Sequence, residues 1–315
     1  MPHDIGIQGS YRTGNIGDRA LGELFQREFS KRGYQSSIFD KRVEKSNSTV
    51  RILGGGGVLH DWYGTEHLKK RLNYISTNGL VVGVGVPGFE SAKAKSLVKN
   101  SLSNVELITV RDKRSKRKLD PICDSKVIKT ACPAFLYEDP ETTESDVTGV
   151  NFRPWFNLDS SVLSYYFDYN KTIDIEKAKK DYIKNIRHIC GEIRNPVFIP
   201  FTKEDEEFAN KYLNIKILDY CRSVSKTLER VSAVKKMVSM RYHSLIFAVI
   251  CEKPIVAIEY APKVGSLTDR LNIDSYRPHG EIALSFERAN NVDELKQDAQ
   301  RNFDLAEPIL ESKIK

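Results

Sequence analysis

A short polar segment in the second half of the chain combines residue types that could bind an anion and transfer a proton. Arg241, Tyr242 and His243 stand between a predicted strand and an apolar helix, and Lys263 follows the next predicted strand. Arginine can bind a carboxylate or phosphate through two parallel hydrogen bonds, and lysine adds a point charge. Histidine exchanges a proton near neutral pH. The segment therefore predicts a site for a multiply charged anion. The alternative is a buried His243 that only links two loops.

The protonation of His243 is expected to depend on its ligand. Ser244 is in position to cap the apolar helix, which would place His243 at the helix N-terminus. The positive end of a helix disfavours imidazolium, whereas a bound phosphate favours it. We therefore expect His243 to gain its proton when an anionic ligand arrives.

Two glycine-rich segments in the first half follow predicted strands. The first is GSYRTGNIGD (residues 9–18), and the second is LGGGGVLHD (residues 53–61). Bare backbone at a strand end admits a ligand or another chain segment, and a helix N-terminus favours an anion. Asn15, Asp18, Gly55 and Gly56 are thus candidate cleft residues. The alternative for the first segment is a tight turn with Asp18 as helix N-cap.

Further candidates lie at the ends of other strands. His60 and Asp61 follow the four glycines, and Arg111 ends a later strand, where it could bind a carboxylate or phosphate. The alternatives are a structural role for His60 and an Arg111–Asp112 pair that closes the end of the sheet. The basic run at residues 113–118 has no interleaved aromatics, so a solvated face is favoured over binding of single-stranded nucleic acid.

Short apolar segments alternate with helical patterns along the whole chain, which indicates α/β architecture with mainly parallel sheets. In the first half, strands are expected at 5–8, 36–39, 50–53, 80–84, 106–110 and 126–128. In the second half, they are expected at 147–152, 197–200, 215–218, 236–239 and 255–258. An acidic, proline-containing stretch at 138–145 is the best linker. We therefore predict two Rossmann-like domains, residues 1–140 and 141–315, whose strand ends face a shared cleft.

Composition limits the partners and the compartment. The formal net charge is +7 and the pI is about 9.0, which favours anionic partners. The five cysteines are irregularly spaced with no C-x-x-C pair, which argues against disulfides and a zinc site and fits a cytoplasmic protein. No signal-peptide pattern opens the sequence, and the densest apolar run, residues 245–251, is too short to span a bilayer. Any membrane contact is expected to be peripheral.

The chain resembles the polysaccharide pyruvyl transferases through nearly its whole length. The resemblance rests on the order and spacing of several motifs, of which R-x-H with its downstream Y-x-x-K is the most specific. The motifs are GSYRTGNIGD, RILGGGGVLHD, VVGVGVP, TVRD, TACPAF, VNFRP, FIPFTKEDEEF and RYHSLIFAVICEKPIVAIEYAPK. The resemblance implies a GT-B-like fold and transfer of pyruvyl from phosphoenolpyruvate to a sugar of a cell-surface polysaccharide or its precursor, usually as a ketal.

The resemblance also implies roles for individual residues. Arg241 and His243 match the donor-site residues, with Tyr242 packing beside them, and Arg111 matches an arginine that holds the donor. His60 lies where the family places residues near the acceptor sugar. The chain departs from the family at Arg19, where members often carry an acidic or small residue, which implies either a different acceptor preference or a more basic cleft.

The expected chemistry needs neither a metal nor a cofactor. Protonation of the methylene carbon of phosphoenolpyruvate by His243 makes the adjacent carbon electrophilic. A sugar hydroxyl attacks that carbon, phosphate leaves, and Arg241 and Lys263 offset its charge.

Three other functions remain open at the level of sequence. One is a GT-B glycosyltransferase with a nucleotide-sugar donor, and another is a non-catalytic protein that binds anionic glycans. The third, nucleic-acid binding, is opposed by the fold and by the absence of a recognised module.

Overall fold

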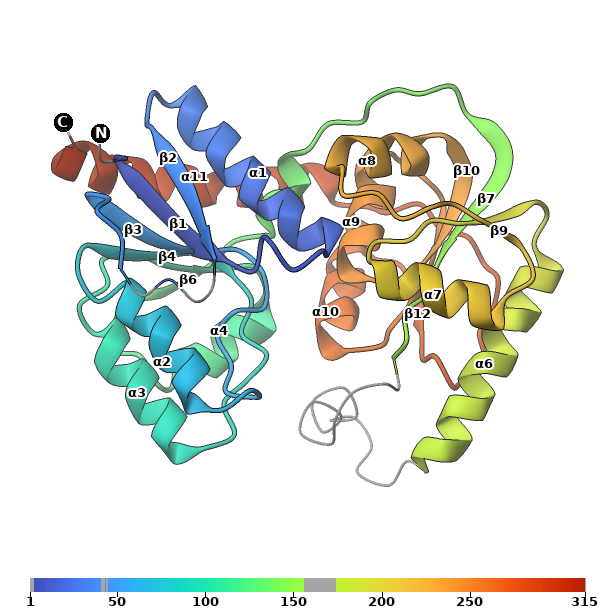
Figure 1. Cartoon of the computed structure of the whole chain (residues 1–315), viewed down its shortest axis with the longest axis horizontal. Helices are drawn as coiled ribbons and strands as arrows, with labels where there is room; N and C mark the ends of the chain where they lie inside the picture. The colour runs from blue at the N-terminus through green and yellow to red at the C-terminus, as the bar shows by residue number, and fades with distance from the viewer. Residues whose placement is uncertain (1–2, 41–42, 44, 156–173, 315) are drawn as a thin grey trace. The chain divides into compact units, whose positions relative to one another are not determined.

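The computed structural model describes residues 3–40, 43, 45–155 and 174–314. The chain divides into two compact units, Met1–Leu136 with Asp293–Lys315, and Tyr137–Val292. Each unit contains one six-stranded parallel sheet with helices packed on it (Figure 1). This arrangement confirms the prediction of two Rossmann-like α/β domains.

The first unit alternates strands and helices. Its strands are β1 (Ile5–Gly9), β2 (Ser36–Asp40), β3 (Val50–Gly54), β4 (Gly79–Val84), β5 (Ile108–Val110) and β6 (Val127–Lys129). Its helices are α1 (Ile16–Lys31), α2 (Thr65–Tyr74), α3 (Ala92–Leu102), α4 (Lys113–Leu119), the 3₁₀ turn η1 (Pro133–Leu136) and α11 (Val292–Ile314).

The second unit repeats the alternation. Its strands are β7 (Ser145–Asn151), β8 (Pro196–Phe198), β9 (Lys216–Ile217), β10 (Val234–Ser239), β11 (Ile255–Ile258) and β12 (Ser275–Tyr276). Its helices are α6 (Ile175–Glu192), α7 (Lys203–Tyr212), α8 (Val224–Ser232), α9 (Tyr242–Ile250) and α10 (Pro262–Leu271). The two-residue strand β12 was not predicted, because two residues are too few for a strand pattern.

The strand order of each sheet locates the place where a ligand is expected. The first sheet runs β2-β1-β3-β4-β5-β6, so its order reverses between β1 and β3. The second runs β12-β11-β10-β7-β8-β9 and reverses between β7 and β10. Helices leave neighbouring strands toward opposite faces at such a reversal, which opens a crevice at the carboxyl ends. The glycine-rich segments follow β1 and β3, and Arg241 follows β10.

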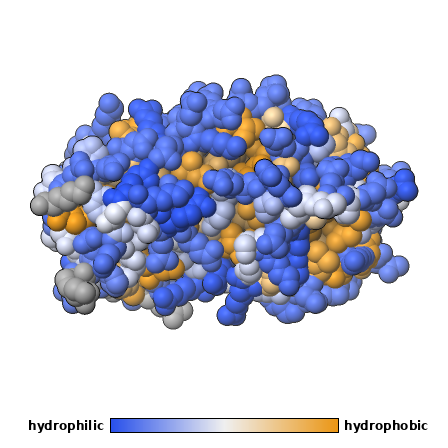
Figure 2. All heavy atoms as spheres, turned by 90° about the horizontal axis from the view of Figure 1, so that it is seen from above, coloured by the Kyte–Doolittle hydropathy of each residue, from blue (hydrophilic) through white to orange (hydrophobic). Residues whose placement is uncertain are grey.

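Strands β1, β4 and β11 are buried along their length because helices cover both faces of each sheet. Hydrophilic side chains cover most of the molecular face shown in Figure 2, with smaller hydrophobic patches between them. Among the described residues, no helix combines the length and apolar character needed to cross a membrane.

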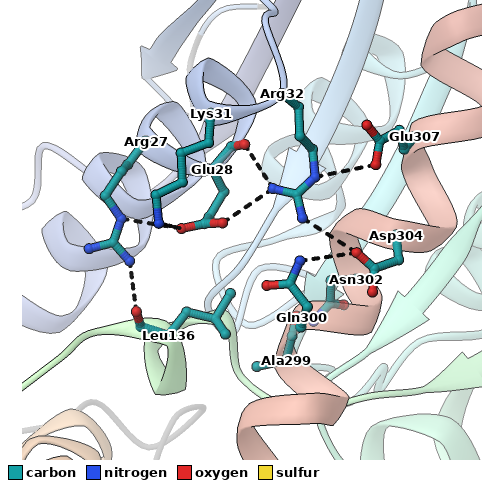
Figure 3. A network of polar contacts seen from close by, with 10 residues as sticks. All are labelled: Arg27, Glu28, Lys31, Arg32, Leu136, Ala299, Gln300, Asn302, Asp304 and Glu307. Atoms are coloured by element: carbon teal, nitrogen blue, oxygen red, sulfur yellow. Dashed lines mark hydrogen bonds and ion pairs between the residues drawn. The ribbon is translucent and has the colours of Figure 1, made fainter.

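The C-terminal helix α11 belongs to the first unit, although the sequence-based division assigned residues 141–315 to the second. Its Asn302 is fully buried, and Asn302 Oδ1 accepts hydrogen bonds from Thr109 Oγ1 at 2.6 Å and Thr130 Oγ1 at 2.8 Å. Arg32 of α1 forms ion pairs with Asp304 and Glu307 (Figure 3). Sequence order could not reveal these contacts, because the chain returns to the first sheet only after the second is complete.

Candidate functional site

The carboxyl ends of β7 and β10, where the order of the second sheet reverses, hold Arg241 in a fixed position. Arg241 is the N-cap residue of α9 and is buried. Its backbone N–H donates to Asn151 Oδ1 at 3.2 Å, and its carbonyl accepts from Ser244 Oγ at 2.8 Å. Helix α9 thus begins at Tyr242 rather than at Ser244, so Ser244 is not its cap and His243 lies in the first helical turn.

The guanidinium of Arg241 is bound by a buried carboxylate. Nε donates to Asp205 Oδ2 and Nη2 donates to Asp205 Oδ1, both at 2.6 Å, and Nη2 also donates to Thr202 Oγ1 at 2.9 Å. The two-pronged edge that we expected to hold an anion is therefore occupied by Asp205. Among the described residues, Nη1 is the guanidinium nitrogen that these contacts leave for a ligand.

Lys263, Tyr260 and Tyr242 lie together beside Arg241. Lys263 follows β11 in the first turn of α10, and its Nζ lies 5.2 Å from the ring centroid of Tyr260 and 6.0 Å from that of Tyr242. The ring of Tyr242 meets that of His243 edge to face, with 5.3 Å between centroids. Both Tyr242 and His243 are buried. The fold therefore gathers the four predicted donor residues of the second unit at the ends of two adjacent strands.

Arg153 joins this cluster, although the sequence pattern assigned it no role. It follows β7, and its Cζ lies 4.6 Å from the ring centroid of Tyr260. Burial opposes ionisation of the Tyr260 phenol, but the Lys263 and Arg153 cations outweigh burial and lower its pKa to about 8. The sequence did contain a signal for Arg153: in VNFRP it follows a predicted strand, just as Arg241 follows another.

The two helices that start in this cluster are not capped by the side chains of their own N-cap residues. Arg241 of α9 and Ala261 of α10 make no side-chain cap hydrogen bond, and neither does Gly64 of α2. By contrast, α1, α3, α4, α6, α7 and α8 are each capped by their own N-cap side chain. Uncapped N–H groups of the first turn bind anions readily. The cationic side chains and the two helix ends therefore favour the same kind of ligand.

In the first unit, the loop after β1 ends in a capped helix. Asn15, and not Asp18, is the N-cap of α1, and Asn15 Oδ1 accepts from Gly17 N at 2.9 Å. Asp18 lies in the first turn of α1 and accepts from Thr13 Oγ1 at 3.4 Å. Thr13, Asn15 and Asp18 therefore form one short, hydrogen-bonded N-terminal turn at the order reversal of the first sheet.

The run of four glycines that begins with the last residue of β3 serves both backbone shape and packing. Gly55 and Gly56 have φ values of +60° and +72°, which other residues rarely adopt. A Cβ on Gly55 would come 3.0 Å from a methyl group of Leu21, and one on Gly56 would lie 3.8 Å from Asp18 Oδ1. The two glycines thus bring the loop after β3 against the start of α1.

Asp61 ties two loops together. Its carboxylate accepts hydrogen bonds from Glu90 N at 2.9 Å, Ser91 N at 3.0 Å and Ser91 Oγ at 2.9 Å. Partial burial acts to raise the pKa of this carboxyl, but the hydrogen bonds outweigh it and hold the pKa below its usual value. These contacts favour a positioning function for Asp61.

His60 belongs to an aromatic group on the same loop. The centroid of its ring lies 4.5 Å from that of Trp62 and 5.6 Å from that of Tyr63, and Tyr63 is 56% exposed. His60 itself is buried. The structure therefore places His60 beneath an exposed aromatic surface at the end of β3.

Arg111 is buried at the end of β5 beside Asp112. Its Nε lies 3.5 Å from Asp112 Oδ2, and Asp112 caps α4 by accepting from Ser115 N at 2.6 Å. The guanidinium also lies against Gly85 and hydrogen-bonds Cys132. The structural pair that we considered for Arg111 and Asp112 is therefore present.

In the described ranges 3–40, 43, 45–155 and 174–314, no group of three or more His, Cys, Asp or Glu side chains could hold a metal ion. All five cysteines are free thiols.

The solved structures that resemble this chain share little sequence with it. A search of curated proteins found no match. One solved structure, an "alpha-glucosyltransferase in complex with UDP and a 13-mer DNA containing a HMU base", is 11% identical, with 99% of this chain and 93% of that chain covered and a TM-score of 0.39. Another, an "alpha-glucosyltransferase in complex with UDP-glucose and DNA containing an abasic site", is 9% identical, with 96% and 89% covered and a TM-score of 0.43. The fold assignment rests on the strand order of the two sheets themselves.

The family model for polysaccharide pyruvyl transferases matches residues 15–262. The match runs from the N-cap of α1 to the first residue of α10, and so includes the strand ends that carry Arg111, Arg153 and Arg241. The chain is therefore a transferase of the polysaccharide pyruvyl transferase family.

Proposed function

We propose that the protein transfers the pyruvyl group of phosphoenolpyruvate to a hydroxyl of a sugar in a cell-surface polysaccharide or its precursor, and closes it as a ketal. The observation that carries this proposal is the cationic cluster of Arg153, Arg241 and Lys263, which follow β7, β10 and β11 at and beside the order reversal of the second sheet. Phosphoenolpyruvate carries a carboxylate and a phosphate, so a site with several cations and two helix N-termini suits it.

The residues of the cluster suggest how the reaction would proceed. His243 would donate a proton to the methylene carbon, and the neighbouring carbon would become electrophilic. The oxygen of a sugar hydroxyl would bond to that carbon, the bond from carbon to the phosphate oxygen would break, and phosphate would leave with its electron pair. A second hydroxyl would close the ketal. The proton of the first hydroxyl would leave with the phosphate, and that of the second would restore the proton of His243. Lys263 and Arg241 Nη1 would offset the charge on the departing phosphate.

Acceptor recognition belongs, in this proposal, to the loops of the first unit. Asn15, Asp18, Gly55, Gly56 and His60 are the candidates, since they lie at or beside the order reversal of the first sheet. We also keep Arg111 as a proposed donor residue. Arg111 is buried and its Nε lies 3.5 Å from Asp112 Oδ2, so a structural pair of the two residues is the alternative to a donor contact. Acceptors attached to lipid would bring the protein to the cytoplasmic face of the membrane as a peripheral protein.

Calorimetric titration tests the donor. Wild type should bind phosphoenolpyruvate, and Lys263→Met should weaken binding by about tenfold, the scale of one lost charge-assisted contact. Lys235→Met is the matched control, because Lys235 lies on β10 and its side chain is 60% exposed. Binding of a uridine diphosphate sugar in place of phosphoenolpyruvate would show that the donor is a nucleotide sugar and would reject the proposal.

Single-turnover transfer tests the reaction. With saturating phosphoenolpyruvate and a panel of sugars, phosphate release should accompany a pyruvyl mass gain on the acceptor. His243→Gln should keep donor binding and lose about 10²–10⁴-fold in rate, the usual contribution of an acid–base group. Donor binding without transfer to any sugar of the panel would favour a binding protein for anionic glycans, and a His243→Gln variant with wild-type rate would remove His243 from the reaction.

A further inference from the structure

We infer that Asp205 is a positioning residue for pyruvyl transfer, because it locks the guanidinium of Arg241 in the orientation that leaves one edge for the donor. The inference rests on the proposed function and adds to it a residue on α7 that binds the guanidinium of Arg241. The alternative is that the pair is a structural clamp between α7 and α9.

Both carboxylate oxygens of Asp205 are fixed by hydrogen bonds. The side chain is fully buried, and Oδ2 accepts from Phe201 N at 3.1 Å, Thr202 N at 3.2 Å and Arg241 Nε at 2.6 Å, while Oδ1 accepts from Arg241 Nη2. Thr202 in turn accepts from Asp205 N at 3.1 Å, so the two residues form a capping box at the start of α7. The backbone N–H groups of Phe201 and Thr202 thus hold the carboxylate independently of Arg241.

Hydrogen bonds also fix both the backbone and the side chain of Arg241. Its backbone is fixed by Asn151 from β7 and by Ser244 from α9, and its side chain is fixed by Asp205 and Thr202 from α7. Three strand ends, those of β7, β8 and β10, therefore determine where the guanidinium points. Catalytic groups must be held within about 0.5 Å of their productive position, and locked side chains achieve this.

Two roles of Asp205 predict opposite effects of its removal on the use of the donor, so an experiment can separate them. Asp205 partly neutralises Arg241, so removal of its charge would strengthen the attraction of the site for an anion. If Asp205 instead positions Arg241, its removal lets the guanidinium turn away from the donor or bind it in an unproductive orientation. Asp205→Asn keeps the shape of the side chain and an oxygen for the two backbone N–H groups, so it tests the charge and the second hydrogen bond.

The experiment measures kcat and KM for phosphoenolpyruvate in Asp205→Asn, with folding checked by circular dichroism. We expect kcat/KM to fall by roughly 10- to 100-fold, as a misplaced catalytic contact does. Glu206→Gln is the matched control: it lies next to Asp205 on α7 but pairs with exposed Lys203. An unchanged or higher kcat/KM in a folded Asp205→Asn variant would overturn the inference.

A double-mutant cycle shows whether Asp205 acts through Arg241. In an Arg241→Lys background the two hydrogen bonds from the guanidinium to Asp205 are already lost. Asp205→Asn should therefore reduce kcat/KM by less than about threefold further. Fully additive losses would overturn the inference. If the wild-type protein does not bind phosphoenolpyruvate, the proposed function is overturned together with the inference. This outcome is distinguishable from failure of the inference alone, because it is seen in the wild-type protein without any variant.

A second variant keeps the inference testable if Asp205→Asn does not fold. Thr202→Val removes the hydroxyl that accepts from Arg241 Nη2 and from Asp205 N. Ser223→Ala is its control, because it removes the equivalent cap of α8, where Ser223 Oγ accepts from Lys226 N. Thr202→Val should lower kcat/KM by about threefold or more while Ser223→Ala leaves it unchanged. Equal values for the two variants would overturn the inference.

Discussion

The guanidinium of Arg111 lies across the backbone of Gly85, so that a Cβ on Gly85 would come 2.7 Å from Cζ, Nε and Nη2 of Arg111. The two residues follow adjacent strands, β4 and β5, and Gly85 N also donates to Gly56 O at 2.7 Å. The glycine after β4 is therefore required by an arginine from the next strand as well as by the loop after β3.

Replacement of Gly85 by alanine should displace Arg111. The added methyl group overlaps a buried guanidinium, so we expect the free energy of unfolding to fall by about 1–3 kcal/mol. Chemical denaturation measures the change. Gly191→Ala is the control, because Gly191 lies in α6 with open space around it, and alanine there should stabilise the helix by about 0.5–1 kcal/mol. A Gly85→Ala variant as stable as wild type would contradict the packing of Arg111 against Gly85.

Tyr260 should ionise at lower pH than an ordinary tyrosine. Burial resists the charge, but Lys263 and Arg153 lower the pKa of Tyr260 from 10.0 to about 8. Because the folded-state pKa is the lower one, this group adds stability as pH rises from about 8 to 10, and the contribution disappears as pH falls below 8. The ultraviolet absorbance of tyrosinate should show a titration near pH 8 that is absent from Tyr260→Phe. A profile with no difference between the two proteins would contradict the prediction.

Phosphoenolpyruvate should suppress the same titration. The donor would bring negative charge to Lys263 and Arg153 and so compete with the Tyr260 phenolate for the same cations. With saturating donor, the absorbance change should move to higher pH, whereas an unchanged midpoint would place the donor away from Tyr260. Potassium chloride at equal ionic strength is the control for screening.

Removal of the Asp61 carboxylate should loosen the loops of the first unit. Asp61→Ala leaves the N–H groups of Glu90 and Ser91 without their acceptor, so we expect a loss of about 1–3 kcal/mol at neutral pH. Since the folded-state pKa of Asp61 is lowered, its stabilisation is present above the usual carboxyl pKa of 3.8 and is lost as pH falls below that value. Urea unfolding should therefore give a difference between wild type and Asp61→Ala that shrinks below about pH 4. A difference that is constant with pH would exclude the charge as its cause.

Asn302 should contribute most of the polar attachment of α11. Asn302→Ala removes the side-chain acceptor of the Thr109 and Thr130 hydroxyls and the donor to the carbonyl of Ala131, three buried hydrogen bonds whose loss should cost roughly 3 kcal/mol or more. Thermal unfolding measures the loss. Gln300→Ala removes only an exposed contact with Asp304 and should stay within about 0.5 kcal/mol of wild type. Equal stability of the two variants would contradict the assignment of α11 to the first unit.

The sequence alone determined the fold class and most of the strands. Apolar runs such as those of β1, β4 and β11 are visible because a parallel strand covered by helices on both faces is apolar throughout. The same local logic placed Arg111 and Arg241 at strand ends, since each follows an apolar run directly, and Lys263 in the loop and helix start that follow β11. Local patterns also located the glycine-rich loops, because only glycine tolerates the positive φ of Gly55 and Gly56.

Only the tertiary structure decided what each of these residues contacts. Asp205 stands 36 positions from Arg241, yet it binds the edge of the guanidinium that the sequence assigned to a ligand. Asn302 and Thr109 are 193 positions apart, and their hydrogen bond assigns α11 to the first unit. Residue type and spacing report the local backbone, whereas these pairings depend on which strands become neighbours, and strand order is set by the packing of the whole sheet.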